Sequence, residues 1–200
     1  MGAGALFDLE EQFGFYGAYH THPMNLVIHV IFVWPLLFSI LVFCAYSPPF
    51  VSTPPLPFCP FSGTEQYVIF NLAFVLALLY ATCYLLLDKK GGWVALLLLI
   101  GCWLGANGFV SALGRNLAWK VALAIQIIGW ASQFFGHFAF EGRRPALFDN
   151  LVQALLTAPY FVLLEVMQKF FGYEPNPGFH QRMQLKIKQN IDEHEMKKEM

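Results

Sequence analysis

Five apolar segments, each close to the length that crosses a lipid bilayer, dominate this sequence of 200 residues. A helix needs about 20 apolar residues to span the hydrocarbon core. Backbone N–H and C=O groups find no partners in lipid, so such segments are expected to be helical. The five segments are Leu26–Tyr46, Tyr67–Leu87, Trp93–Leu113, Leu117–Phe138 and Phe148–Phe171. The sequence therefore predicts an all-α fold, a polytopic membrane helix bundle.

The composition agrees with a membrane protein and excludes several other classes. Charged residues make up 12% of the chain, about half of the roughly 25% that is usual in soluble domains. The net charge of −1 and the lack of a basic cluster argue against a nucleic-acid partner. The four cysteines form no C-x-x-C pair and suggest no disulfide framework. The first 14 residues have three carboxylates and no basic residue, so we expect internal helices, not a cleaved signal peptide, to drive insertion.

Two polar stretches divide the chain. Residues 47–66 contain six prolines, which fix φ and lack the amide donor, so we expect an extended loop there. After Tyr173, a short linker leads into a polar tail with mixed charges at helical spacing, which predicts a solvated helix. The predicted organisation is an integral-membrane catalytic domain at 1–173 and a polar cytosolic tail at 174–200.

Lysine and arginine gather in the loops on one side of the predicted membrane. The loop at 47–66 has neither residue, and the loop after the third segment has only Arg115. The loops on the N-terminal side hold Lys89, Lys90, Arg143 and Arg144. Because cytosolic loops carry an excess of positive charge, we expect the N-terminal side to face the cytosol.

The fifth segment is unusual, since it contains Pro159 and Glu165, which are both costly in lipid. The last four residues, Lys-Lys-Glu-Met, resemble the dilysine signal that returns membrane proteins to the endoplasmic reticulum and is read in the cytosol; the alternative is a chance match in a lysine-rich tail. Two cytosolic termini require an even number of spans. We therefore expect four spanning helices plus a re-entrant fifth segment, which turns near Ala158-Pro159 and returns.

This topology brings several potential metal ligands to one depth on the N-terminal side. They are His20 before the first span, His29 near its start, and His137 and Glu141 near the end of the fourth span. His137 and Glu141 are four residues apart and so share a helix face. Glu165 joins them only if the fifth segment is re-entrant. Imidazole with carboxylate suits Fe, Zn, Cu or Ni, and open positions beside two histidines and a carboxylate suit non-haem Fe(II) and O2. The alternative is a set of hydrogen-bonded structural histidines.

Neighbouring residues allow two interpretations each. Asn25 is either a donor that fixes an imidazole tautomer or the N-cap of the first span. Tyr16 and Tyr19 fit an interfacial aromatic belt. Arg143 and Arg144 either bind an anionic headgroup or simply set the topology.

Two long stretches, FYGAYHTHPMNLVIHVIFVWP and GWASQFFGHFAFEGRRPALFDNLVQALLTAPYF, resemble the endoplasmic-reticulum 2-hydroxy fatty acid dioxygenase family. The resemblance covers roughly residues 5 to 173. It implies a multi-spanning, Fe(II)-dependent enzyme of the endoplasmic reticulum membrane. Such enzymes convert 2-hydroxypalmitate, derived from phytosphingosine, to an odd-chain fatty acid.

The resemblance also implies a site. Its motifs fall on Tyr19, His20, Asn25, His29, Gly136, His137, Glu141, Arg143, Arg144, Pro145 and Glu165. We expect His20, His29 and His137 to hold Fe(II), with Glu141 or Glu165 completing or supporting the set. Substrate binding is expected to involve Tyr19, Asn25, Arg143 and Arg144. His22 departs from the family pattern, which leaves its role open.

The stoichiometry of this reaction is self-sufficient, since a 2-hydroxy acid and O2 give the acid one carbon shorter, CO2 and water. No nicotinamide cofactor is then needed, and the chain has no G-x-G-x-x-G fingerprint. Other hypotheses are a desaturase-like enzyme, which needs more histidines, a bis-histidine haem protein, and a transporter, for which no internal repeat is visible. An alternative that is not an enzyme is a lipid-binding or scaffold protein of the membrane.

Overall fold

The computed structural model describes residues 7–51, 64–142, 144–145, 147 and 151–199, and in this part of the chain it is helical with no strand. The elements in order are α1 (Leu9–Ala18), α2 (Pro23–Cys44), η2 (Thr64–Gln66), α3 (Leu72–Leu87), α4 (Gly91–Leu113), α5 (Arg115–Gly136), η3 (His137–Glu141), α6 (Leu151–Phe171) and α7 (Phe179–Glu199). The predicted all-α class is confirmed.

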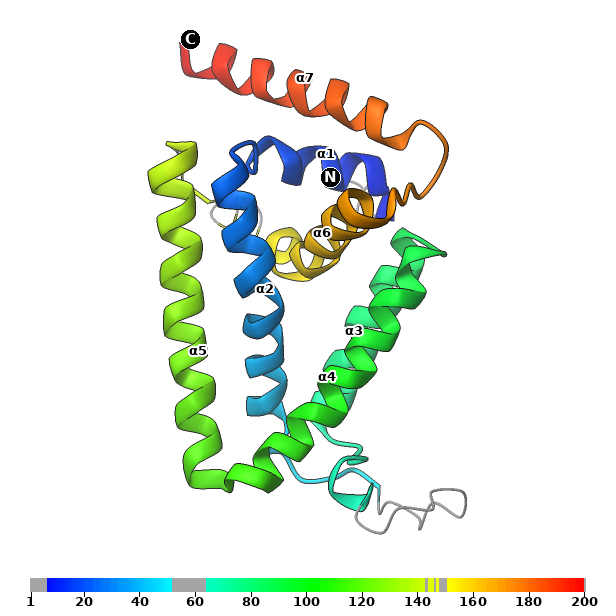
Figure 1. Ribbon diagram of the computed structural model, residues 1–200, viewed down its shortest axis with the longest axis vertical. Coiled ribbons are helices and arrows are strands. Elements are labelled where there is room, and N and C mark those ends of the chain that lie inside the picture. Colours follow the sequence, from blue (N-terminus) through cyan, green and yellow to red (C-terminus); the bar gives the residue numbers. More distant parts are fainter. Residues whose placement is uncertain (1–6, 52–63, 143, 146, 148–150, 200) are drawn as a thin grey trace.

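Four helices of the described chain are long and apolar enough to cross a membrane: α2, α4, α5 continued by η3, and α6; α3 is apolar but shorter. Helices α2 to α5 run along the long axis of the molecule (Figure 1). Large apolar side chains project from their outer faces, among them Ile31, Leu97 and Phe135, each more than half exposed. Such a surface suits lipid, so the chain is a multi-pass membrane protein.

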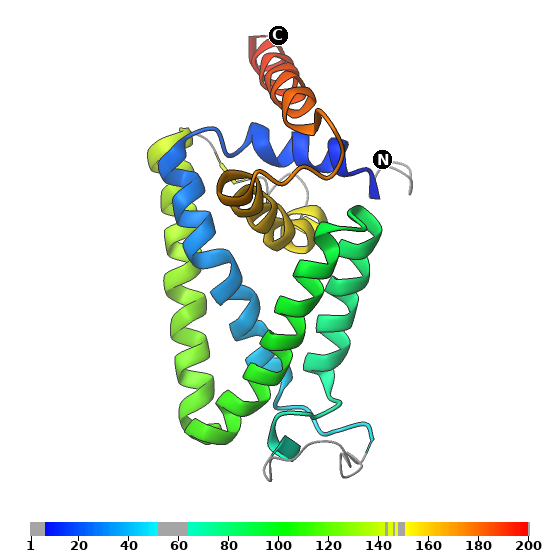
Figure 2. The ribbon, with the colours of Figure 1, turned by 45° about the vertical axis from the view of Figure 1, so that its right-hand side comes forward.

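The four long-axis helices form two arms. Helices α2 and α5 lie side by side in one arm, and the α3–α4 hairpin forms the other (Figure 1). The arms diverge toward the end where α1 lies, and α6 fills the space between them (Figures 1 and 2). Helix α3 starts five residues later than the expected Tyr67, because the Asn71 side chain caps it by accepting hydrogen bonds from the amides of Ala73 and Phe74 at 3.1 and 3.4 Å.

The expected turn at Ala158-Pro159 is wrong, because α6 is one continuous helix with Pro159 inside it. A proline deprives the carbonyl four residues earlier of its helical donor. Here that carbonyl belongs to Leu155, and the hydroxyl of Tyr80 on α3 donates to it at 3.2 Å. The adjacent carbonyl of Leu156 likewise accepts from Tyr84 at 3.0 Å. The neighbouring arm thus supplies the donor, and the helix continues through the proline.

Helix α6 nevertheless stays near one end of the bundle. Its middle and the second residue after its C-terminus both reach the loop between α3 and α4, because Tyr160 and Tyr173 donate to the Asp88 carboxylate at 2.6 and 2.7 Å. The fifth segment is therefore an oblique helix between the arms (Figure 2), not a hairpin.

Helices α1 and α7 cover this same end (Figure 1). The Asp8 side chain caps α1, and α7 packs on α1 through the ion pairs Arg182–Glu10 at 2.8 Å and Lys186–Glu11 at 2.7 Å. The tail is helical as predicted, and it buries Phe179. Residues 52–63 of the proline-rich loop and the side chains of the two terminal lysines lie outside the described residues.

Candidate metal centre

Three histidines from three separate elements converge at the end of the bundle that α1 covers. His20 follows α1, His29 lies in the second turn of α2, and His137 opens η3. One ring nitrogen of each lies within 4.8 Å of the others. His29 and His137 are buried, and His20 is half-buried. Converging imidazole nitrogens in a buried place could hold a transition-metal ion.

Backbone carbonyls orient two of these rings. The Nδ1 of His20 lies 2.7 Å from the carbonyl oxygen of Tyr16, and that of His29 lies 2.9 Å from the carbonyl oxygen of Asn25. The His20 ring also stacks on the Tyr16 ring, with centroids 4.0 Å apart. A Nδ1–H that donates to a carbonyl places the lone pair on Nε2, which is the tautomer that ligates a metal.

His137 lies where α5 changes into one π-helical turn, His137–Glu141, that ends at Gly142 with a left-handed φ of 63°. π-Helical turns are rare in proteins, and many of those that occur lie at functional sites. The turn also presents Glu141 to the connection between α1 and α2. The wider turn therefore brings both ends of η3, His137 and Glu141, close to the connection between α1 and α2.

Glu141 joins the segment that carries His20 and His29 to the segment that carries His137. Its carboxylate accepts hydrogen bonds from the Thr21 hydroxyl at 2.6 Å, the His22 amide at 2.9 Å and the Asn25 amide group at 2.9 Å. Within the described residues, the converging ligand group contains three histidines and no carboxylate. The geometry thus favours a supporting place for Glu141 over a ligating one.

The contacts of α2 exclude one of the two interpretations of Asn25. The N-cap of α2 is His22, whose Nδ1 accepts from the Met24 amide at 3.2 Å, so the cap interpretation of Asn25 is wrong. Asn25 is fully buried and donates to Glu141 and to the Tyr19 carbonyl. His22 stacks on Phe140, and its ring is not part of the converging group.

Glu165 on α6 lies on the same side of the bundle as the three histidines. Burial chiefly, and then the negative charges of Glu165 and Glu141, raise the pKa of the Tyr16 phenol well above its ordinary value. Tyr16 is therefore a neutral hydrogen-bond donor at physiological pH. Like Glu141, Glu165 contributes no oxygen to the converging group.

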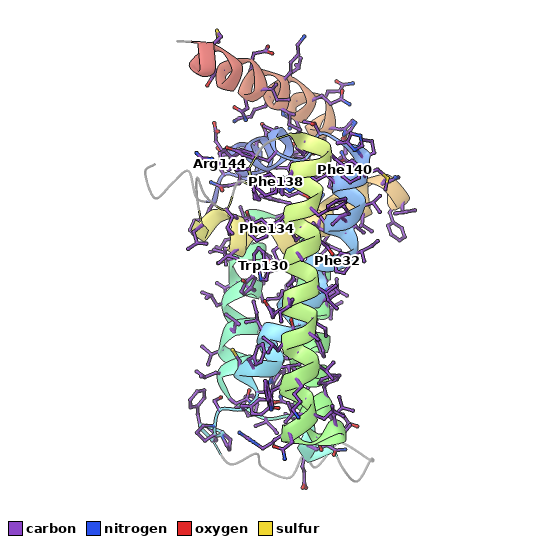
Figure 3. The ribbon with its side chains drawn as sticks, turned by 90° about the vertical axis from the view of Figure 1, so that its left-hand side faces the viewer. Phe32, Trp130, Phe134, Phe138, Phe140 and Arg144 are labelled. Atoms are coloured by element: carbon purple, nitrogen blue, oxygen red, sulfur yellow. The ribbon has the colours of Figure 1, made fainter. Side chains whose placement is uncertain are left out.

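Of the two arginines predicted to bind substrate, the structure describes only Arg144. Arg144 is exposed and lies beyond Phe138 at the end of α5 (Figure 3), and Arg143 lies outside the described residues. Tyr19 is buried and contributes its carbonyl to Asn25. A substrate contact of Tyr19, Arg143 or Arg144 stays a prediction.

An apolar cavity adjoins the histidines and extends between the two arms. Its lining contains all three histidines. From His29 to Ile40, the lining follows α2 over eleven residues, about 16 Å at the helical rise. The remaining walls come chiefly from Tyr16, Tyr80, Trp130, Gln133, Phe134, Leu155 and Ala158. A cavity of this length suits an extended apolar ligand.

Sequence reasoning missed Tyr16 and Gln133 as residues of this cavity. Gln133 has a signal in the sequence, because it lies one helical turn before His137 and so shares its face. Tyr16 has the same spacing to His20. The cavity itself depends on how α6 fits between the arms, which no local pattern encodes.

Comparison with known proteins agrees with the geometry. A family model described as 2-hydroxy-palmitic acid dioxygenase Mpo1-like matches residues 6–170. The 2-hydroxy-palmitic acid dioxygenase MPO1 of Saccharomyces cerevisiae is 38% identical over 191 residues, which cover 94% of this chain and 95% of the yeast protein. No solved structure matches. The chain belongs to the Mpo1-like family of 2-hydroxy-palmitic acid dioxygenases.

Proposed function

We propose that this protein is a membrane dioxygenase that converts 2-hydroxy fatty acids, such as 2-hydroxypalmitate, to the fatty acid one carbon shorter. The observation that carries the proposal is the convergence of three histidines, within 4.8 Å, on one end of an apolar cavity. This places a metal-binding group beside a space suited to an acyl chain. Family membership supplies the reaction class.

The donor set fits Fe(II). Imidazole suits iron, and an iron ion held by three imidazoles would keep positions for the hydroxyl and carboxylate of the substrate and for O2. Iron, when bound there, would supply the redox chemistry that joins O2 to C2 of the substrate. His20, His29 and His137 would hold it, and Glu141 would fix the relative positions of the segments that carry them.

The protein's other contribution is to hold the substrate and exclude water. The acyl chain would lie along Val33, Leu36 and Ile40 of α2, away from the histidines. Its C2 would then face the imidazoles. All four electrons come from the substrate, because the 2-hydroxy acid and O2 yield the shorter acid, CO2 and water, so no external reductant enters.

Localisation in the endoplasmic reticulum with both termini in the cytosol belongs to the same proposal. Helices α1 and α7 lie at one end of the bundle, as two ends on one side of a membrane require (Figure 1). Lys89, Lys90 and Arg144 follow segments that end on this side. Protease protection of tags at the two termini in sealed microsomes would test the orientation.

The decisive experiment is anaerobic purification, loading with Fe(II), and incubation with O2 and 2-hydroxypalmitate labelled with 13C at the carboxyl carbon. We expect unlabelled pentadecanoic acid and labelled CO2 from the wild type. His29→Ala is expected to give neither product, whereas His180→Ala, a matched change on the exposed surface of α7, keeps full activity.

Each other outcome has a separate meaning. A protein that binds stoichiometric iron but forms no product would contradict the assignment of 2-hydroxypalmitate as the substrate. Neither iron nor product, in a folded protein that still binds lipid, would support the lipid-binding alternative. A Soret band would support a haem protein.

A further inference from the structure

Two buried polar groups in the cavity wall have no hydrogen-bond partner among the described residues: the Nε2 of Gln133 and the hydroxyl of Tyr16. Both side chains are more than nine-tenths buried, and both line the cavity. Burial of a donor without a partner is unfavourable, and native proteins rarely tolerate it without a reason. Each group therefore requires an explanation.

Other amide donors inside the bundle, the half-buried Gln126 and the buried Asn71 and Asn107, have their hydrogen-bond partners. Gln126, seven residues before Gln133 on the same helix, donates to the Leu36 carbonyl at 2.9 Å and to the Ser39 hydroxyl at 2.8 Å. Asn71 donates to Asn107 at 2.8 Å, and Asn107 donates to two backbone carbonyls. Gln133 differs from these in facing the cavity.

The two donors flank the histidines. The ring of Tyr16 stacks on that of His20, and Gln133 lies one turn before His137 on α5. The rest of the cavity, toward Ile40, is apolar. A ligand with one anionic end and a long apolar remainder would satisfy both donors and the apolar wall at once.

We propose that Gln133 and Tyr16 form the receptor for the substrate's carboxylate, with the Gln133 amide and the Tyr16 hydroxyl donating to its oxygens. This inference rests on the proposed function, in which the substrate is a fatty acid. A carboxylate has about four lone-pair sites, so it can accept from both donors and still face the histidines. The receptor fixes which end of the acyl chain lies beside the three imidazoles.

The test uses metal-free protein in nanodiscs, so that binding is measured without turnover. Trp130 lines the cavity, and its fluorescence reports an entering chain. The probes are palmitate and 1-hexadecanol, which share a chain length but differ in charge. We expect the wild type to prefer palmitate and Gln133→Leu to bind palmitate about tenfold more weakly, the usual loss for a hydrogen bond to a charged group, with the alcohol nearly unaffected.

Thermal stability separates this role from a structural one. Gln133→Leu removes an unsatisfied donor, so we expect an unchanged or higher melting temperature together with the weaker palmitate binding. The matched control Gln126→Leu removes the donor to the Leu36 carbonyl and the Ser39 hydroxyl and leaves the Trp130 indole N–H without its acceptor. It is therefore expected to lower the melting temperature and to keep the preference for palmitate. Tyr16→Phe is expected to reduce the preference as Gln133→Leu does.

Three results would overturn the proposal: a wild type with no preference for the acid, Gln133→Leu and Tyr16→Phe variants that keep the preference, or a Gln133→Leu variant that loses stability as Gln126→Leu does. The proposed function fails separately. One pair of results separates the two proposals: the wild type makes no shorter acid, and Gln133→Leu abolishes the preference for palmitate. This pair would support the carboxylate receptor and contradict the dioxygenase reaction.

Discussion

Two carboxylates at the same end of the bundle organise their surroundings in different ways. Asp88 accepts four hydrogen bonds, from the Tyr160 and Tyr173 hydroxyls and from the Lys90 and Gly91 amides, at 2.6–3.1 Å. Glu141 accepts three, two from Thr21 and His22 in the α1–α2 connection and one from Asn25 in the first turn of α2. The Asp88 cluster is complete within the chain. Beside Glu141, in contrast, lie three imidazoles whose nitrogens converge on one place.

The difference separates a structural cluster from a functional one. Around Asp88, every donor named above has its acceptor, so the cluster ties α6 to the α3–α4 loop. Around Glu141, hydrogen bonds join η3 to the segment that carries His20 and His29. The three histidines, Tyr16 and Gln133 line the cavity. We therefore expect mutations at the first site to change stability and mutations at the second to change activity.

The largest effect is expected from His137→Ala. Removal of one of three convergent imidazoles takes away a metal ligand, so turnover should fall to the background while the protein still accumulates. Iron content by mass spectrometry and pentadecanoic acid formation would be measured together. Full activity of the variant would refute the metal role of His137.

Asp88→Ala is expected to give the opposite pattern. It leaves the buried Tyr160 hydroxyl, the partly buried Tyr173 hydroxyl and two backbone amides without their acceptor. The expected cost is about 3 kcal/mol, since each unsatisfied buried group costs roughly 1–3 kcal/mol. Thermal unfolding in nanodiscs would measure the loss. Activity per folded molecule, at a temperature well below the midpoint, should be close to that of the wild type. A loss of activity without a loss of stability would contradict the structural role of Asp88.

Glu141→Gln should lie between these two. The amide keeps the size of the side chain but replaces one accepting oxygen with a donor, which faces either the Thr21 hydroxyl or the donors of His22 and Asn25. Changes in groups that support metal ligands typically cost about 10–100-fold in affinity or activity, and we expect a weaker Fe(II) affinity of that order. Glu10→Gln, which alters only the surface ion pair with Arg182, is the matched control.

A smaller effect is expected from Gly136→Ala, which tests the contact between α2 and α5. An added Cβ would lie 2.5 Å from the Asn25 Oδ1, so the asparagine and its bond to Glu141 must shift. Overpacking of this kind costs about 1–3 kcal/mol. Gly101→Ala on α4 meets nothing within 4 Å and should leave both activity and stability intact. Equal behaviour of the two variants would contradict the close approach.

Much of this arrangement was predictable from local patterns. Apolar length gives the helices, and the positions of His20, His29 and His137 relative to the spans place them at one depth. The rest depends on partners far away in the sequence. The helix continues through Pro159 because Tyr80 reaches the carbonyl of Leu155, and the cavity exists because α6 lies obliquely between the arms. Neither fact is encoded within one segment.

The smallest predicted effect is a pH dependence that belongs to the Asp88 cluster. Burial, and then the hydrogen bond to Asp88 and its charge, raise the pKa of Tyr173 above its ordinary value near 10. A raised folded-state pKa gives stability that is fully present below the unfolded value and is lost as the pH rises above it. Tyr173→Phe should lower stability at pH 8 by about 1 kcal/mol, the net worth of one hydrogen bond. The difference in stability between the variant and the wild type should shrink above pH 10, because only the wild type has a phenol that must stay protonated in the folded state. Thermal melts of both proteins between pH 8 and pH 11 would show this convergence, whereas a difference that stays constant over this range would contradict the raised pKa of Tyr173. Activity at neutral pH should be unchanged, because Tyr173 contacts the structural cluster and does not line the cavity.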